Sequence, residues 1–444
     1  VHTSYSTDAG MFGNRLGPDK AYRFARGEEV VSSTGVRAKL VRPLDWLVIA
    51  DHAENLGLAP MIAESNPDLL RNAWGKMVHD LTKGGKGDEA YAAWTEKMGV
   101  RDNPLPGDDL QRTMWERLTE FAEEYNDPGT FTALIGYEWT SSPGGSNLHR
   151  NVIFRDDKNR TDQVIPFSNY DSSDPEDLWK WMAAYEEKTG GRVLAIPHNG
   201  NLSNGLMFDE VTLTTKKPLD LDSAERRSRW EPIYEVTQIK GDGEAHPMLS
   251  PDDEFADYGT WDRGSFGAIK EKDMIPREYA REALKRGLQY QQDLGGNPFK
   301  FGMVGRTDTH TSLSTAGEMN FFGKAPPGEP SDDPERLEEM MTGYMPDPEG
   351  RDFAIRHYDT LAAGLAGVWA TGNTRKELWD AMKRKEVYAT TGPRMTVRLF
   401  AGWEFDEADV HRADYARHGY TKGVPMGGDL SKAPEGKAPA FVVR

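Results

Sequence analysis

The stretch LDWLVIAD, residues 44–51, decides the fold class predicted for this chain, because it is a short apolar run that ends in a carboxylate. Similar runs recur along the chain, at residues 132–139, 192–198, 234–240 and 301–308, with a weaker one at 366–371. These runs are almost continuously apolar rather than alternating, which is typical of strands buried on both faces of a parallel sheet. We therefore expect a central sheet built from these segments.

Longer amphipathic segments separate the apolar runs. They have the spacing and the end residues of helices, and they cover residues 67–84, 108–125, 174–191, 276–296 and 374–386. The repetition of strand and helix predicts an α/β fold, a (β/α) barrel that is incomplete or distorted. After residue 395 the pattern changes, so we expect a barrel over residues 1–395 and the beginning of a β-rich segment over residues 396–444, with the chain truncated at both ends.

The composition narrows the classes of partner. The chain of 444 residues has 54 Lys and Arg against 72 Asp and Glu, a formal net charge of −18, which disfavours nucleic acid and anionic membranes as partners. There is no cysteine, so disulfides and thiolate metal sites are excluded. No apolar run approaches the roughly 20 residues that a membrane span requires. Any transition metal must be bound by His, Asp or Glu.

Four predicted strands end in a possible metal ligand. His52 follows the run at 44–51, Glu138 lies near the end of 132–139, His198 ends 192–198, and His310 follows 301–308. In a (β/α) barrel the carboxyl ends of the strands meet at one rim, where active sites form. Imidazole and carboxylate ligands together suit Zn, Mn or Fe. The sequence therefore predicts a metal cluster at this rim.

Several short motifs resemble those of the PHP superfamily, named for polymerase and histidinol phosphatase domains. They are VHTSYSTDAG (1–10), IADHAENLG (49–57), YEW (137–139) with NLHRN (147–151), IPHNG (196–200) and TDTH (307–310). Longer matches, such as HTSYSTDAGMFGNRLGP and YATTGPR, resemble a bacterial branch catalogued as a domain of unknown function. The resemblance covers residues 1 to about 395 and implies a distorted (β/α)7 TIM-like barrel.

The resemblance also implies two or three divalent metal ions, Zn, Mn or Fe, in overlapping sites. The implied ligands are His2, Glu138 and Asp308 for the first site, Glu138, His149 and His198 for the second, and Asp8, His52 and His310 for the third. Asp8 stands where many relatives have His, which predicts a weaker third site. A further His is expected just before Val1, so we expect upstream residues to be missing and the first site of this chain to be defective.

Other polar residues near the predicted strand ends are candidates for catalysis or substrate binding. Asp51 either orients a ligating imidazole or binds a metal itself. Lys240 contacts a substrate anion and His246 protonates a leaving group, or both lie in a solvated loop. The remaining candidates are Arg150 and Arg306, which bind phosphate or form salt bridges, and Asn199, which orients His198 or donates to substrate.

Together these predictions describe a metal-dependent hydrolase of phosphate esters, mono- or diester, that uses a metal-bridging hydroxide. The alternatives are hydrolysis of a sulfate ester, amide or lactone by the same metals, or a non-catalytic metal-binding module. The expected partner is a small anionic ester, with no nucleic acid and no membrane. Many members of the resembling branch are predicted to be secreted, so we expect a periplasmic or secreted protein, although the chain shows no signal segment.

Overall fold

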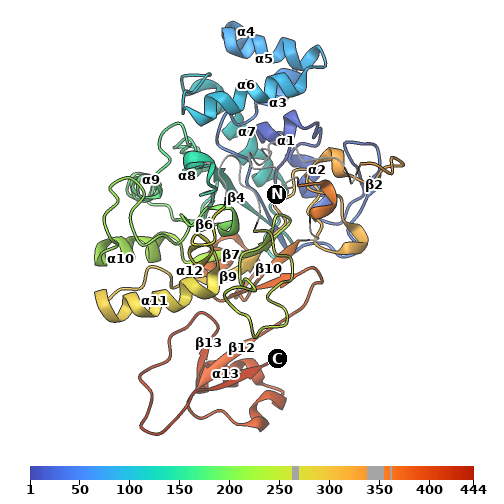
Figure 1. Ribbon diagram of the computed structural model, residues 1–444. Helices are drawn as coiled ribbons and strands as arrows, with labels where there is room; N and C mark the ends of the chain where they lie inside the picture. The colour runs from blue at the N-terminus through green and yellow to red at the C-terminus, as the bar shows by residue number, and fades with distance from the viewer. Residues whose placement is uncertain (263–269, 337, 339–354, 361–362) are drawn as a thin grey trace.

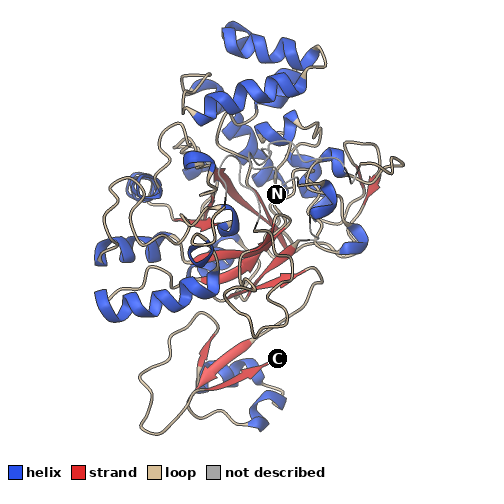
Figure 2. Ribbon diagram, viewed as in Figure 1, coloured by secondary structure: helices blue, strands red, loops and turns tan. Residues whose placement is uncertain are grey.

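A computed structural model describes residues 1–262, 270–336, 338, 355–360 and 363–444. The longest strands lie at the centre of the molecule, and most of the helices surround them (Figures 1 and 2). None of the described helices combines the length and apolarity that crossing a bilayer requires.

The largest sheet has four strands and a mixed direction. Its strands, in spatial order, are β3 (Trp46–Ile49), β4 (Thr132–Trp139), β5 (Arg150–Phe154) and β6 (Val193–Pro197). β3 pairs with β4 in parallel, whereas β4–β5 and β5–β6 are antiparallel. β5 is not among the strands that the sequence pattern predicts. It forms a hairpin with β4 because residues 140–149 are too few for the crossover that a parallel neighbour needs.

The prediction of a (β/α)7 TIM-like barrel was wrong. In the described part of the chain the remaining central strands form two further small sheets. β7 (Ile233–Gln238) pairs in parallel with β9 (Gly302–Gly305) and antiparallel with β8 (Gly241–Asp242), and β10 (Gly364–Val368) pairs antiparallel with β11 (Val387–Thr391). A (β/α) barrel needs one closed ring of parallel strands. The structure is instead a mixed α/β fold with separate sheets.

A cavity of about 620 Å³ is lined by residues from all three of the central sheets. Its walls include Trp46 and Val48 of β3, Val304 of β9 and Leu365 of β10. The apolar pattern that suggested the barrel indicates burial on two faces, but burial specifies neither the neighbour of a strand nor its direction. The pattern therefore fitted a mixed sheet as well as a parallel one.

Helices occur at all five segments where the sequence predicts them. The longer helices are α2 (Pro18–Ala25), α5 (Ala73–Lys83), α6 (Gly87–Gly99), α7 (Asp109–Tyr125), α9 (Pro175–Thr189), α10 (Leu221–Trp230), α11 (Ala280–Leu294), α12 (Arg375–Lys383) and α13 (Tyr415–Lys422); the short ones are α1 (Thr7–Met11), α3 (Leu58–Ala63), α4 (Pro67–Arg71) and α8 (Lys158–Thr161). The helix predicted at 67–84 is broken into α4 and α5. Asn72 has an extended backbone there, and its side chain accepts a hydrogen bond from Gly75 N and caps α5.

The four-stranded sheet is apolar on both faces, which explains its continuous pattern. Ala133 and Ile135 of β4 pack in a cluster that includes residues of α7 and α9. Leu134, between them, belongs to a second cluster, together with Trp379 of α12 and Val304 of β9. Burying a large apolar side chain of this kind contributes about 1.5–3 kcal/mol. The second cluster therefore holds the separate sheets together beneath the strand ends.

Two smaller sheets lie outside this arrangement. β1 (Val30–Val31) and β2 (Arg37–Ala38) form a short hairpin after α2. β12 (Leu399–Gly402) pairs antiparallel with β13 (Val424–Pro425) and β14 (Ala440–Val443), at the position of the predicted β-rich segment. This sheet and α13 have their own apolar core and lie apart from the central strands in Figure 1. The predicted boundary at residue 395 stays a prediction.

Candidate metal centre

The eight predicted metal ligands meet in one cluster at the ends of the central strands, although the barrel that motivated the prediction is not formed. They are His2 and Asp8 near the start of the chain, His52 after β3, Glu138 in β4, His149 ahead of β5, His198 after β6, and Asp308 and His310 after β9. Seven of these residues are buried, and the side chain of Asp8 is 14% exposed. The strand ends converge even though the strands belong to different sheets.

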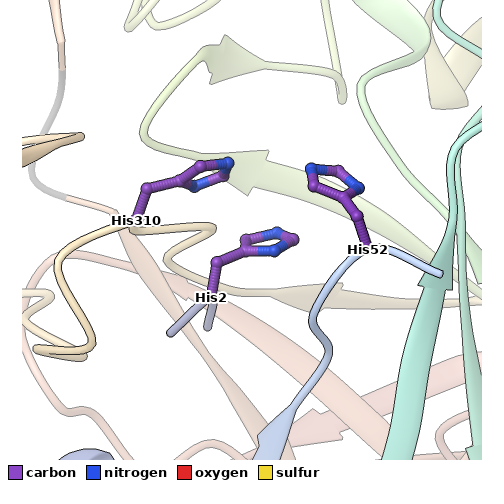
Figure 3. A group of neighbouring side chains, drawn as sticks. All are labelled: His2, His52 and His310. Carbon is purple, nitrogen blue, oxygen red and sulfur yellow. The ribbon is translucent and has the colours of Figure 1, made fainter. Parts of the chain in front are cut away.

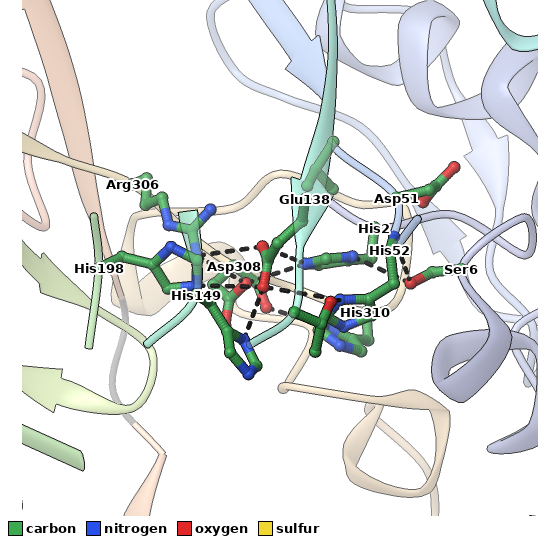
Figure 4. Close-up of polar contacts among 12 residues, drawn as sticks. His2, Ser6, Asp51, His52, Glu138, His149, His198, Arg306, Asp308 and His310 are labelled. Carbon is green, nitrogen blue, oxygen red and sulfur yellow. Dashed lines mark hydrogen bonds and ion pairs between the residues drawn. The ribbon is translucent and has the colours of Figure 1, made fainter. Parts of the chain in front are cut away.

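Glu138 lies at the centre of the cluster, with imidazoles on two sides (Figure 4). Its Oε1 is 2.9 Å from His149 Nδ1 and 3.1 Å from His198 Nε2. Its Oε2 is 3.3 Å from His2 Nε2. Because the two carboxylate oxygens face different histidines, Glu138 is placed to share its charge between two adjacent sites.

Asp308 completes the group around His2. Its Oδ1 is 3.0 Å from His2 Nε2 and 3.0 Å from Arg306 Nη2. The backbone of Asp308 has φ 56°, in the left-handed region that costs a non-glycine residue about 1 kcal/mol or more. Such strain persists where the surroundings hold a residue firmly, and here it turns the carboxylate toward the cluster.

A third group consists of three histidines, His2, His52 and His310 (Figure 3). The ring of His2 lies 4.5 Å from that of His52 and 4.1 Å from that of His310, centroid to centroid. Asp8 Oδ2 is 2.7 Å from His310 Nε2 and 3.2 Å from His52 Nε2. The structure thus brings together the Asp8, His52 and His310 that the resemblance implies for the third site, and adds His2 beside them.

The donor set fits divalent cations. In each of the three groups the possible ligand atoms lie within 4.8 Å of one another. His198 is fully buried, yet neither of its ring nitrogens has a hydrogen-bond partner. Leaving buried polar atoms unpaired costs about 1–3 kcal/mol per group, so such atoms usually signal a missing ligand. A cation bound by His198 and Glu138 would remove this cost.

Around Glu138, His149 and His198 the electrostatics favour the forms that bind metals, whereas at His52 the charges of Asp8 and Glu138 outweigh burial and raise the pKa to about 9. Burial lowers the pKa of His149 to about 4 and holds that of His198 well below its usual range, so both imidazoles are neutral near pH 7. Burial opposes ionisation of Glu138, but the surrounding histidines, among them His52 and the hydrogen-bonded His149, outweigh it and hold its pKa well below the usual value. Neutral imidazole and ionised carboxylate are the states that bind a divalent cation.

Ser6 and Thr140 support the ligands from outside the cluster, and the sequence analysis did not identify them. Ser6 Oγ donates to Asp8 Oδ1 at 2.9 Å and accepts from the backbone N of His52 at 3.2 Å. Thr140 Oγ1 lies 2.5 Å from His52 Nδ1. Each lies two residues from a predicted ligand in the sequence, and this closeness could have identified both residues.

Of the predicted auxiliary residues, Arg306 and Lys240 lie in the cluster. Arg306 Nη2 is 3.6 Å from Glu138 Oε2, and its Nε donates to Glu235. Lys240 Nζ is 2.7 Å from Asp308 Oδ2. Both cations therefore face the proposed ligands directly.

Asp51 and Asn199 lie beside the cluster. Asp51 accepts hydrogen bonds from Thr3 N at 2.6 Å and Thr3 Oγ1 at 2.7 Å, so it fixes the segment that carries His2. Asn199 has φ 50°, and its Oδ1 accepts from Gln238 Nε2 at 2.9 Å. These bonds suit a role in holding the neighbouring histidines rather than direct contact with a metal.

Arg150 and His246 have partners outside the cluster. Arg150 is 2% exposed, and its Nε donates to Glu231 Oε1 at 3.0 Å, so it forms a buried ion pair with a carboxylate outside the cluster. His246 Nε2 lies 3.1 Å from Asp262 Oδ2, and its Nδ1 accepts from Met248 N. These contacts do not support Arg150 as a phosphate ligand or His246 as a proton donor, although they were predicted as such from their neighbours in sequence.

Comparison with known proteins places the chain in one family. Residues 1–444 match the family DUF3604, described as a protein of unknown function, and the chain belongs to it. Neither the curated proteins nor the solved structures include a match to this chain. The family match agrees with the predicted resemblance to a domain of unknown function.

Proposed function

We propose that this protein is a metal-dependent hydrolase of phosphate esters, with two or three divalent cations bound by the cluster around Glu138. The observation that carries the proposal is the convergence of three ligand groups, each with donor atoms within 4.8 Å of one another. The motifs that resemble the PHP superfamily add support, because that superfamily includes phosphoesterases with clustered metals.

The chain supplies ligands and positive charge in the places that phosphoryl chemistry needs. Metal ions, when bound, polarise a phosphoryl oxygen and lower the pKa of a coordinated water. Glu138 offers its two oxygens to neighbouring sites, and the neutral imidazoles of His149 and His198 complete one of them. Arg306, held by Glu235, directs a guanidinium edge toward Glu138 and the cluster, where it can bind a phosphoryl oxygen.

Removal and return of metal tests the proposal. The protein is dialysed against a chelator, then assayed on a chromogenic phosphate ester after addition of Zn, Mn or Fe. We expect activity to vanish and return with metal, and His198→Ala to abolish the recovery. His411→Ala is the matched control, because His411 is exposed on a C-terminal segment.

The same assay separates the alternatives. Sulfate ester, amide and lactone substrates are compared with the phosphate ester under the same metal, since ligands alone do not select the bond that is cleaved. Hydrolysis of one of these in place of the phosphate ester would refute the phosphoesterase assignment. Tight metal binding without hydrolysis of any substrate in the panel would favour a non-catalytic metal-binding module.

A further inference from the structure

Two buried lysines share one carboxylate at the edge of the cluster. Lys240 follows β7, and its Nζ is 2.7 Å from Asp308 Oδ2. Lys324 lies in the segment after β9, and its Nζ is 3.2 Å from the same oxygen and 2.6 Å from the Asp308 carbonyl. Each lysine is 6% exposed. Lys324 was not predicted from the sequence, because it does not follow a predicted strand.

The pairing is unusual because a buried ammonium needs an anion, and here the two ammonium groups have one carboxylate oxygen between them. Arg306 also contacts Asp308, at Oδ1, but it has a second carboxylate in Glu235. Lys324 contacts one more side chain, His310, whose Nδ1 is 2.6 Å from its Nζ. A neutral imidazole supplies no charge, so Asp308 is the anion on which both lysines depend.

Metal binding changes this balance. The charged side chains that pair directly across the cluster are four carboxylates and three cations, namely Asp8, Glu138, Asp308, Glu235, Arg306, Lys240 and Lys324. With every histidine counted as neutral, the form that binds a metal, their formal charges leave one negative charge in excess. Two divalent cations would turn this into three positive charges in excess, and Asp308, as a metal ligand, would share its charge with them. The lysines would then need another anion.

We propose that Lys240 and Lys324 bind a doubly charged terminal oxyanion, so that the substrate is a phosphate monoester rather than a diester; this rests on the proposed function. A monoester carries two negative charges on three terminal oxygens, so it can bind both ammonium groups and also contact the metal ions. A diester carries one charge on two free oxygens, which leaves a buried ammonium without an anion. The two lysines therefore determine specificity by the charge of the group they accept.

Titration of the metal-loaded protein with inorganic phosphate and with dimethyl phosphate tests this inference by calorimetry. We expect phosphate to bind at least ten-fold more tightly than dimethyl phosphate. Lys240→Met and Lys324→Met should each weaken phosphate binding about ten-fold or more, the loss expected for one hydrogen bond to a charged group. Lys324→Arg keeps the charge and should retain most of the affinity. Lys285→Met is the control, because the Lys285 side chain is 64% exposed.

Metal binding, measured separately for each variant, separates a failure of this inference from a failure of the proposed function. We expect the methionine variants to bind metal as tightly as the wild type or more tightly, because an ammonium no longer competes for Asp308. Equal phosphate affinity in wild type and both methionine variants with metal bound would overturn the role of the lysines, as would equal binding of dimethyl phosphate. Absence of metal binding in the wild type would defeat both this inference and the proposed function. Phosphate binding through the lysines without ester hydrolysis would defeat the proposed function alone.

Discussion

Replacement of His198 by leucine should have opposite effects on stability with and without metal. The His198 side chain is fully buried, its ring nitrogens have no hydrogen-bond partner, and Nε2 lies 3.1 Å from Glu138 Oε1. In the metal-free protein, each unpaired polar group costs about 1–3 kcal/mol. Leucine removes both groups, while its different shape costs about 1 kcal/mol in packing. Removing two such groups returns about 2–6 kcal/mol, so after the packing cost His198→Leu should raise the free energy of unfolding of the metal-free protein by about 1–5 kcal/mol.

Metal should reverse the benefit of this substitution. At a concentration one hundred times its dissociation constant, a cation stabilises the wild type by about 2.7 kcal/mol. If the loss of His198 weakens binding about a hundredfold, the same concentration stabilises the variant by only about 0.4 kcal/mol. The metal-induced gain should thus differ by about 2 kcal/mol between the two proteins.

Urea unfolding of wild type and His198→Leu, each with chelator and with Zn or Mn, measures both effects. His411→Ala is the control, and it should follow the wild type in both conditions. The reasoning is refuted if His198→Leu destabilises the metal-free protein by several kcal/mol, since the ring would then have partners that matter. It is equally refuted if metal stabilises the wild type and His198→Leu by the same amount.

Three further predictions concern residues around the cluster. Burial raises the pKa of Asp242 to about 7, so between about pH 4 and pH 7 folding takes up a proton at this carboxyl. The contribution of Asp242 to stability is therefore full below about pH 4 and is lost as the pH rises through 7. Asp242→Asn should make the free energy of unfolding, measured across this range, less dependent on pH. Arg150→Met should cost about 1.5–3 kcal/mol, because it removes one of the two arginines that pair with buried Glu231 and leaves Arg227 as its remaining cation, while metal affinity measured by calorimetry stays unchanged; a large loss of metal affinity would contradict this assignment. Thr140→Val should weaken metal binding about 10–100-fold, because it removes the hydroxyl beside His52 Nδ1, and unaltered affinity would show that this contact does not orient the ring.

The position of His and carboxylate residues along the sequence indicated which side chains lie together, even though the predicted fold was wrong. His52, Glu138, His198 and His310 each lie at or just after an apolar run, and the carboxyl ends of β3, β4, β6 and β9 do meet. This prediction needs only local information, namely where a buried strand stops and which side chain follows. It does not depend on how the strands pair between their ends.

The sequence did not predict which strands pair or in which direction. The run at 132–139 predicts a buried strand, but whether β4 has a parallel or an antiparallel neighbour depends on β5, which the analysis did not recognise. Partner choice and direction are set by contacts between segments far apart in the chain and by the length of their connection. A barrel and several mixed sheets give the same apolar pattern along each strand.

The sequence by itself indicated most of the central strands and five helical segments, the absence of thiolate chemistry, and the set of His and carboxylate residues that form the cluster. Only the tertiary structure decided that Arg150 faces Glu231, that Lys324 reaches Asp308, and that the sheets remain separate. The physical reason is that hydrophobic periodicity and strand ends are local properties, whereas the direction of a long charged side chain depends on which buried partner lies within its reach. For a lysine or arginine near a candidate metal ligand in sequence, that partner is fixed only when the distant segments pack.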